Sequence, residues 1–521
     1  MYRNKGTITV FLSLISMLFL SLFCTMAESV RVQAARFQAA AAFDMGLFSI
    51  FGEYDRVLLE EYDLWFLDGS NEEQKIREVL ETKLEKYIQP NINPRYNLAA
   101  GRSWDVFPTE LDRCTVDKYA LATDHGGQVF YSQAVENQKE LFVGEAASAL
   151  KKNIKQMEEG HQKGEEYQNE EQKADEEYQR AQAVQMEEKK RQESEKENAE
   201  KQEESDIKET EAVQAKVENP LDQIKKIKSM GILGLVLKDG TVVSDKTIER
   251  KNLPSERNLQ KGSLLVNEIS ADPVSEAIFL NYLQKHFQCA VDEGGKHQKG
   301  SKEHSLSYEL EYIIGGQKSD RENLKKTVNR ILLIREGMNY ATLAKSAKMR
   351  GEAMALAAAI TGAAALPEFA GALQKLLMLA WAYGESLLDV RTLLAKGKVP
   401  MLKAETEWKL PLEKLGMLAE VLKECDAGGG NGQSYEDYLS GLLILGKKQQ
   451  RNLRVLDLIE CNRRMEKGGE TFRVDALVAQ AEASADFELA PVFLRVPAVW
   501  MHVRNQGTAY TIKGQYGYGQ P

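Results

Sequence analysis

The sequence predicts an α+β protein in which a single N-terminal transmembrane helix extends into a long helix. Three observations support this fold class. An apolar run covers Thr7–Ala27, a helical and comparatively apolar stretch covers Leu306–Trp408, and segments rich in β-branched and aromatic residues lie before and after that stretch. We therefore expect a helical bundle plus small antiparallel β-sheets, with a long charged helical insertion at 150–218.

The apolar run Thr7–Ala27 has the length of one membrane span. No charged residue stands between Lys5 and Glu28, and about 20 apolar residues in a helix cross a hydrocarbon core of about 30 Å. A cleaved secretory signal is the rival interpretation, because Thr25-Met26-Ala27 offers a small-x-Ala site. We favour an uncleaved anchor, since signal cores are shorter and the helical pattern continues past Ala27.

The positive charges on the two sides of this run predict its orientation. Arg3 and Lys5 precede it, whereas Arg31 and Arg36 follow it, which gives a modest bias toward a cytoplasmic N-terminus. The expected location is the cell membrane, crossed once. The lipid bilayer is then the first partner, and the bulk of the chain is extracytoplasmic.

A face of small residues runs along the predicted span. Thr9, Ser13 and Ser16 have i, i+4 and i+7 spacing, so they share one side of a helix, where a neighbouring helix can pack closely in lipid. Beyond the span, Ala34 and Ala41 belong to an apolar stripe with alternating steps of three and four residues, interrupted at Asp44 and Asp55. Its members are Val30, Ala34, Phe37, Ala41, Phe48, Phe51, Leu58, Tyr62 and Trp65. Serines that the span merely tolerates, and a stalk helix packed on its own domain, are the alternatives.

Composition limits the classes of function. The chain has 521 residues, 43% of them hydrophobic, and a net charge of −10, which suits two to four domains with real cores. A net charge of −8 falls within Lys151–Glu218, so no basic footprint for nucleic acid is present. The five cysteines are too few and too widely spaced for a disulfide scaffold, and their pairing stays open.

Along the chain we expect six segments. They are an anchor with a long amphipathic helix at 1–66, an α/β segment with a hairpin at 67–149, the charged insertion at 150–218, a small β-containing segment at 219–303, a helical domain at 304–470, and a C-terminal β segment with a loose tail from Gly514 at 471–521. The insertion is half charged, so we expect a solvated or partly disordered helix whose removal leaves the rest folded.

Turn signals and apolar periodicity predict the local structure. Two hairpins are expected, one joining Thr115–Leu121 to Val129–Val135 and one around Asp239-Gly240 between Ile232–Leu237 and Thr241–Val243. Helices are expected at 72–88, ended by Pro90 and Pro94, and over Tyr435–Met465 as one element. The alanine-rich run Ala353–Leu366 is expected to form a buried helical hairpin with Leu373–Ala382, and strands at Phe472–Ala481 and Val492–Ile512.

No catalytic, cofactor-binding or metal site is predicted. His286, Cys289, His297 and His304 lack the tight paired spacing of zinc ligands, so solvated residues are the expectation. Glu385 and Asp389 could suggest acid/base chemistry, but with Arg391 nearby we interpret them as charge pairs in a helical core. The glycine-rich stretch 426–432 lacks the Gly-Lys-Ser/Thr ending of a phosphate loop.

These residues suggest a family. Lys5-Gly6-Thr-Ile-Thr-Val-Phe11 followed by the apolar run resembles the start of TadE/TadG-like proteins, minor pseudopilins of tight-adherence pilus systems. The larger pattern resembles a Gram-positive family of uncharacterised membrane proteins. The stretches that carry this likeness are Glu28-Ser29-x-Arg31-x-Gln33, Asn219-Pro220, Tyr308-Glu-Leu-Glu-Tyr-Ile-Ile314, Ser319-Asp320-Arg-x-Asn323, Arg330-x-Leu-Leu-x-x-Arg335-Glu336, Trp381-Ala-x-x-Glu385-x-x-x-Asp389-x-Arg391 and Gly397-Lys-Val-Pro400.

The resemblance implies a non-enzymatic, membrane-anchored structural protein of the cell envelope. Such a protein would be a pilus-like (Tad-type) assembly or secretion-system component, with other pilus-like or envelope proteins or copies of itself as partners. The alternative is a single-span extracytoplasmic binding or sensory protein. An envelope hydrolase ranks last, because the sequence shows no nucleophile–His–acid set and no HExxH motif.

Overall fold

The computed structural model describes residues 4–70, 75–92, 107–139, 144–199, 219–238, 240–265, 269–270, 272–291, 303–363, 367–425, 430–493 and 507–518. It confirms the α+β class, with a majority of helix and a small antiparallel sheet. The chain forms two compact units, each assembled from separate stretches. Unit 1 contains 1–140, 251–270 and 455–521, and unit 2 contains 141–250 and 271–454.

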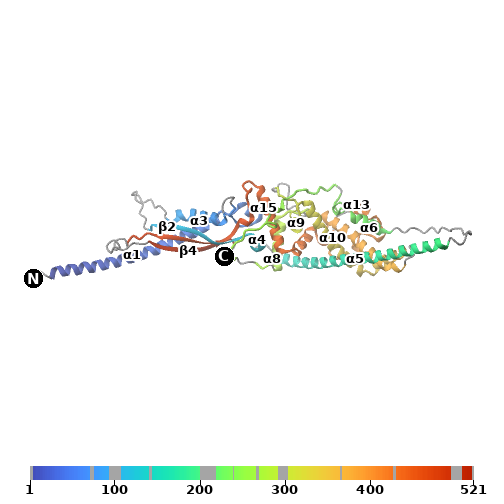
Figure 1. Ribbon diagram of the computed structural model, residues 1–521, viewed down its shortest axis with the longest axis horizontal. Helices are drawn as coiled ribbons and strands as arrows, with labels where there is room; N and C mark the ends of the chain where they lie inside the picture. Colours follow the sequence, from blue (N-terminus) through green and yellow to red (C-terminus); the bar gives the residue numbers. More distant parts are fainter. Residues whose placement is uncertain are drawn as a thin grey trace. The chain divides into compact units, whose positions relative to one another are not determined.

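Unit 1 is built on the long helix α1 (Asn4–Phe51). One long apolar helix at the N-terminus is thus confirmed, and its most apolar window is not buried at all. The second half of α1 packs on the sheet and on α3 (Ile76–Ile92), as the left part of Figure 1 shows. Unit 1 also contains α2 (Arg56–Tyr62), α4 (Asp124–Lys139) and, from Val455 on, the larger part of α15 (Lys448–Met465).

The sheet of unit 1 is antiparallel and centred on β3 (Leu477–Leu489). Strand β2 (Thr109–Leu121) pairs with it in a register that sets Val116 opposite Ala483. Strand β4 (Thr508–Gly517) and the two-residue β1 (Leu67–Asp68) also pair with β3. A single core joins the sheet to α1 and α3 through apolar side chains such as Phe43, Leu84 and Phe487.

Unit 2 is a helical bundle, which confirms the helical character expected for its main part. Its α-helices are α5 (Gly144–Ala199), α6 (Pro220–Ser229), α7 (Ile232–Val236), α8 (Pro273–His286), α9 (Glu309–Gly315), α10 (Asp320–Lys345), α11 (Ala347–Ala363), α12 (Ala370–Leu394), α13 (Leu418–Glu424), α14 (Tyr435–Leu445) and the start of α15 (Lys448–Met465). Short 3₁₀ helices in the chain cover Arg250–Asn252, Pro367–Phe369, Glu405–Glu407, Leu412–Met417 and Val474–Ala476. Helix α12 is buried over most of its length, and α11 packs along it as the expected helical hairpin. The expected burial is wrong for α11, because only the side that carries Ala353, Ala357 and Thr361 is covered.

The predicted hairpin around 124–127 is wrong. Its first half is β2, but Val129–Val135 lies within helix α4. His125, Gly126 and Gly127 all have positive φ angles, so the chain turns out of the strand into a helix. The strand partner of β2 is β3, more than 350 residues later, which no local turn signal can announce.

The second predicted hairpin is also wrong. Ile232–Val236 is the short helix α7, and no strand occurs at 241–243. Arg391 on α12 donates to the carbonyl oxygens of Leu235 and Leu237 at 3.2 and 2.9 Å. The last carbonyls of α7 therefore bind a guanidinium from the bundle instead of a second strand.

Two helix boundaries differ from the prediction. Helix α3 continues through Pro90 to Ile92, because Ile88 and Ile92 are buried in the core and Gln38 of α1 donates to the Ile92 carbonyl at 2.6 Å. The expected helix Tyr435–Met465 is two helices, since Gly446 leaves the helical conformation with a ψ of 163°.

The charged segment is more integrated than its composition predicts. Within α5, Met157, Tyr167 and Ala174 are buried, and Gly164 fits closely against the Leu333 carbonyl of α10. The expectation of a solvated helix is therefore wrong for this half of α5, because a narrow apolar stripe suffices where two helices approach at glycine. Residues 200–218 lie outside the described part of the chain.

The C-terminal strands are confirmed in kind, at 477–489 and 508–517, but the tail is not loose from Gly514. Strand β4 runs to Gly517, and the Tyr518 hydroxyl donates to the Phe51 carbonyl of α1. Aromatic packing of Tyr518 and Tyr516 on Phe51 fixes this end.

Candidate functional site

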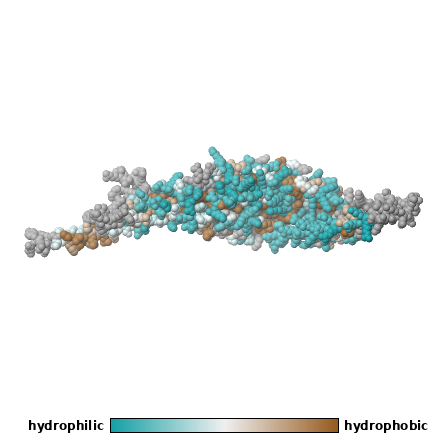
Figure 2. Space-filling view, in the orientation of Figure 1, coloured by the Kyte–Doolittle hydropathy of each residue, from teal (hydrophilic) through white to brown (hydrophobic). Residues whose placement is uncertain are grey.

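The first candidate site is the surface of α1 itself. Thr9, Ser13 and Ser16 are all solvent-exposed on its apolar first half, which Figure 2 shows as a brown segment behind the grey N-terminal tip. The Ser13 hydroxyl donates to the Val10 carbonyl at 2.8 Å, so it is satisfied within the helix. These three residues therefore form a surface that no other part of the described chain covers.

The second half of α1 is apolar on two opposite sides. The buried side presents Ala35, Ala39 and Leu47 to the core of unit 1. The other side carries exposed Val30, Phe37 and Phe48, with exposed fractions of 71, 79 and 64%.

We call this exposed side the α1 stripe and define it as Val30, Ala34, Phe37, Ala41, Met45 and Phe48. Ala34 and Ala41 are half-buried along it. The apolar periodicity in the sequence thus marks the uncovered side of α1, and the core-facing side lies about half a turn away. Leu58 and Tyr62 do not continue the stripe, because α1 ends at Phe51 and both are buried on α2.

The α1 stripe and the small-residue face lie on adjoining sides of the helix. At about 100° per residue, Thr9 and Ser16 project about 40–80° away from Val30, Phe37 and Phe48, and Ser13 projects about 100–120° away from them. One continuous side of α1 is therefore uncovered from its apolar beginning to its packed end.

A buried ion pair fixes α1 where the exposed apolar half ends. Glu28 and Arg31 pair with each other, and Arg31 also donates to the Ala490 carbonyl at 2.6 Å. Glu28 accepts hydrogen bonds from the backbone N–H groups of Val492 and Phe493, at 3.2 and 2.7 Å. Burial raises the pKa of Glu28, but Arg31 and these two donors outweigh it and hold the pKa below its usual range.

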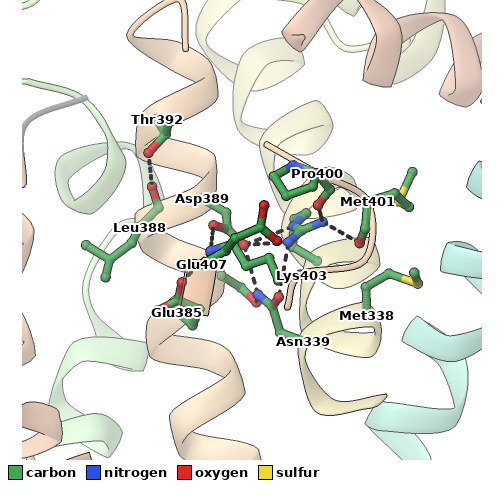
Figure 3. Close-up of polar contacts among 12 residues, drawn as sticks. Met338, Asn339, Glu385, Leu388, Asp389, Thr392, Pro400, Met401, Lys403 and Glu407 are labelled. Carbon is green, nitrogen blue, oxygen red and sulfur yellow. Dashed lines mark hydrogen bonds and ion pairs between the residues drawn. The ribbon is translucent and has the colours of Figure 1, made fainter. Parts of the chain in front are cut away.

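The second candidate is a network of charges in the core of unit 2. Asp389 on α12 pairs with Arg335 on α10 at 2.7 Å and also with Lys403, which in turn pairs with Glu385. Figure 3 shows Glu385, Asp389 and Lys403 close together, and the Asn339 amide donates to Asp389 at 2.9 Å. Arg335, Glu385 and Asp389 are wholly inaccessible to solvent.

Every charge in this network has an opposite charge beside it. Burial opposes ionisation of Asp389, yet Arg335 and Lys403 lower its pKa below the usual value. Burial raises the pKa of Glu385, against the opposing effect of Lys403. The sequence interpretation of charge pairing holds for Glu385 and Asp389, with Arg335 and Lys403 as the partners. Arg391 is not part of the network, since it caps α7.

The expectation that the histidines and cysteine of the considered metal cluster are solvated is wrong, because His286 is buried and Cys289 and His304 are half-buried. His304 Nδ1 lies 2.8 Å from Glu309 Oε1, and His286 is buried with its ring 4.6 Å from that of Tyr282. Cys289 donates to the Val291 carbonyl at 3.1 Å. No group of three metal-ligating side chains occurs among the described residues, and His297 lies outside them.

The third candidate is a pocket that the sequence analysis did not find. It has a volume of about 410 Å³ and lies between the C-terminal end of α9, the first half of α10 and the α14–α15 junction. No acidic residue occurs among its described lining residues. Five basic residues line it, namely Lys326, Arg330, Lys447, Arg451 and Arg454. We call it the basic pocket. The i, i+4 spacing of Lys326 and Arg330 shows from the sequence that the two residues share one face of a helix. Only the tertiary structure brings that face next to α15.

Comparisons with known proteins identify a family without a known role. The model of a family of unknown function, DUF5702, matches residues 210–489, which is more than half of the chain. No curated protein and no solved structure matches the chain.

Proposed function

Because the chain belongs to the family of unknown function DUF5702, we propose its role from its own geometry. We propose that it is a non-enzymatic, membrane-anchored structural protein of the cell envelope, a pilus-like (Tad-type) assembly or secretion-system component. In this proposal α1 is both the single membrane span and the surface through which the protein assembles. The N-terminus is cytoplasmic and both units are extracytoplasmic.

The observation that carries the proposal is the uncovered α1 stripe. Val30, Phe37 and Phe48 expose apolar side chains on a helix whose opposite side is already packed in a core. Exposed apolar residues that line up along one element are characteristic of an interaction surface, whereas scattered ones are ordinary. The stripe adjoins the side of α1 that carries Thr9, Ser13 and Ser16, so a neighbouring helix that crosses α1 at a small angle can follow it from lipid into the aqueous phase.

The bilayer alone does not account for the stripe. The ion pair Glu28–Arg31 and the end of β3 mark the level at which α1 enters the folded part of unit 1. From Val30 to Phe48 a helix rises by about 27 Å, so Phe48 lies far beyond a span that ends at Ala27. The partner that this surface fits is therefore another helix, either from a second copy or from a pilin-like protein.

The experiment places a photo-crosslinking amino acid at Phe37 in the full chain in native membranes. Crosslinks to a copy of the chain or to a helical envelope protein are expected, because this side chain is 79% exposed on the stripe. The same amino acid at Lys118, an exposed residue of β2, serves as the matched control and should give few crosslinks.

Two variants test the two halves of the surface. Ser13→Leu with Ser16→Leu keeps the span apolar, so insertion should persist while crosslinks from position 37 decline. Val30→Asn with Met45→Asn makes the stripe polar and should abolish the crosslinks with little change in thermal stability, since both side chains are already exposed. If wild type gives no crosslinks from position 37, or both variants crosslink as wild type does, α1 is an anchor alone. That outcome favours the single-span binding or sensory protein.

A further inference from the structure

The basic pocket of unit 2 carries more positive charge than its neighbours neutralise. Arg451 is paired with buried Glu276 at 2.7 Å. Lys326, Arg330 and Lys447 have no acidic partner within the described part of the chain. Three cations thus surround one pocket without a compensating carboxylate.

A structural role explains only part of this charge. Helix α9 ends at the pocket, and its last carbonyls accept hydrogen bonds from Lys326 at 2.8 Å and from Arg454 at 2.9 and 3.0 Å. Cations are favourable at a helix C-terminus, but the end of a helix carries about half a negative charge. The Arg330 contact to the Ile314 carbonyl is long, at 3.4 Å, so capping leaves most of its donors for another acceptor.

The cations also destabilise one another. Burial lowers the pKa of Lys326, and the nearby Arg330, Arg454 and Arg250 lower it further. Partial desolvation likewise lowers the pKa of Arg330, whose side chain is still accessible from solvent. A bound anion would stabilise the charged forms of Lys326 and Arg330, because it offsets the repulsion between the cations and accepts hydrogen bonds from their free donors.

Helix α15 adds a complementary feature. Its 18 residues begin at Lys448, directly after the pocket-lining residues Gly446 and Lys447, and its first turn contains no acidic residue. The backbone N–H groups of a first helical turn point toward an anion, and the helix dipole favours negative charge there.

We propose that the basic pocket binds a phosphate group. Three uncompensated cations match a doubly charged oxyanion better than a single carboxylate, and the Arg330 guanidinium offers a planar fork for two phosphate oxygens. The leucines Leu442, Leu443 and Leu445 form an apolar side of the pocket, which suits a phosphate ester with a carbon substituent. The ester is a small soluble molecule or the headgroup of a phospholipid.

The test measures thermal unfolding of the full chain in detergent micelles while inorganic phosphate is raised at constant ionic strength. Phosphate should raise the midpoint, and succinate at the same ionic strength should not. Glycerol phosphate and micelles containing an anionic phospholipid form two further arms. The arm with the larger shift identifies the source as a soluble ester or a lipid headgroup.

Matched variants locate the effect. Lys326→Gln with Arg330→Gln should weaken phosphate binding by about 100-fold, about tenfold for each charged hydrogen bond that the variant removes. Arg321→Gln with Lys325→Gln removes the same charge from positions of α10 that do not line the pocket and should change affinity by less than about threefold. Lys447→Gln alters an exposed residue with no capping contact, so it reports on binding even if the first variant fails to fold.

Two results would overturn the proposal. One is a phosphate shift no larger than that of succinate. The other is a Lys326→Gln, Arg330→Gln variant that starts from a lower midpoint but keeps the full phosphate shift, with Lys447→Gln unchanged as well. In that case the cations only cap α9. Neither result bears on the crosslinking of α1, so the two proposals fail separately.

Discussion

The hydroxyl of Tyr167 on α5 donates a hydrogen bond to the Leu379 carbonyl of α12 at 3.0 Å, and both residues are buried. This contact places a tyrosine from the most charged stretch of the chain in the middle of the helical bundle. Nearby, Met157 of the same helix packs against Gly441 of α14. The charged segment is therefore a structural part of unit 2 at its beginning and a solvated helix farther along.

Two methionines of α5 separate these regions. Met157 is fully buried, whereas Met186 is 68% exposed. Met157→Ala should lower the free energy of unfolding by about 2–5 kcal/mol, because the core cannot fill the cavity. Met186→Ala should change it by less than about 0.5 kcal/mol. Urea unfolding followed by circular dichroism measures both changes in free energy. Deletion of Lys155–Glu211 should abolish the cooperative unfolding of unit 2, because it removes the buried residues Met157 and Tyr167. Equal effects of the two substitutions would contradict the packing of α5.

The buried charges of unit 2 predict a large cost for breaking one pair. Asp389→Asn leaves Arg335 and Lys403 without their shared carboxylate, so the free energy of unfolding should fall by about 3–5 kcal/mol. Glu352→Gln, which removes one end of an exposed pair with Lys348, should cost at most about 1 kcal/mol.

A double substitution distinguishes pairing from packing in this network. Arg335→Met with Asp389→Leu removes both charges together and should reduce stability by less than the sum of the two single changes. Denaturant unfolding of the single and double variants gives the coupling free energy. Strict additivity would mean that the two side chains stabilise unit 2 independently of each other.

Glu336 predicts a pH dependence of stability. Burial raises its pKa from 4.5 to about 8, although Lys228 opposes the shift, and Glu171 adds to it. Between about pH 5 and pH 8 the carboxyl group of Glu336 is therefore protonated in the folded state and ionised in the unfolded chain. Stability should fall as pH rises between about 5 and 8, by up to roughly 1.4 kcal/mol per unit, and level off above the folded pKa.

Unfolding free energies at several pH values test this slope. Glu336→Gln cannot ionise, so its stability should decline less steeply and exceed that of wild type at pH above 8. Glu311, whose pKa burial raises to about 7, leaves some slope in the variant. The exposed Glu352→Gln serves as the control and should follow the wild-type curve. A wild-type curve that is flat from pH 5 to 8 would show that Glu336 is not held neutral.

The sequence alone determined the features that depend on neighbouring residues. The long apolar helix follows from uninterrupted apolar residues at Thr7–Ala27, and the helical hairpin of α11 and α12 from an alanine-rich run before Pro367. Charge pairing of Glu385 and Asp389 was also predictable, because carboxylates in an apolar helix need cations nearby. Their partners Arg335 and Lys403 were not, since these come from other elements.

Only the tertiary structure decided which surfaces are covered. Val30 and Phe37 look like core residues by their spacing, but the sheet packs on the other side of α1, so they remain exposed. The segment Thr115–Leu121 pairs with β3 and not with the adjacent segment, because strand pairing depends on which parts of the chain lie side by side in the fold. The basic pocket likewise exists only because α9, α10 and α15 bring distant lysines and arginines together. Local sequence encodes periodicity, whereas burial depends on contacts between residues that are hundreds of positions apart.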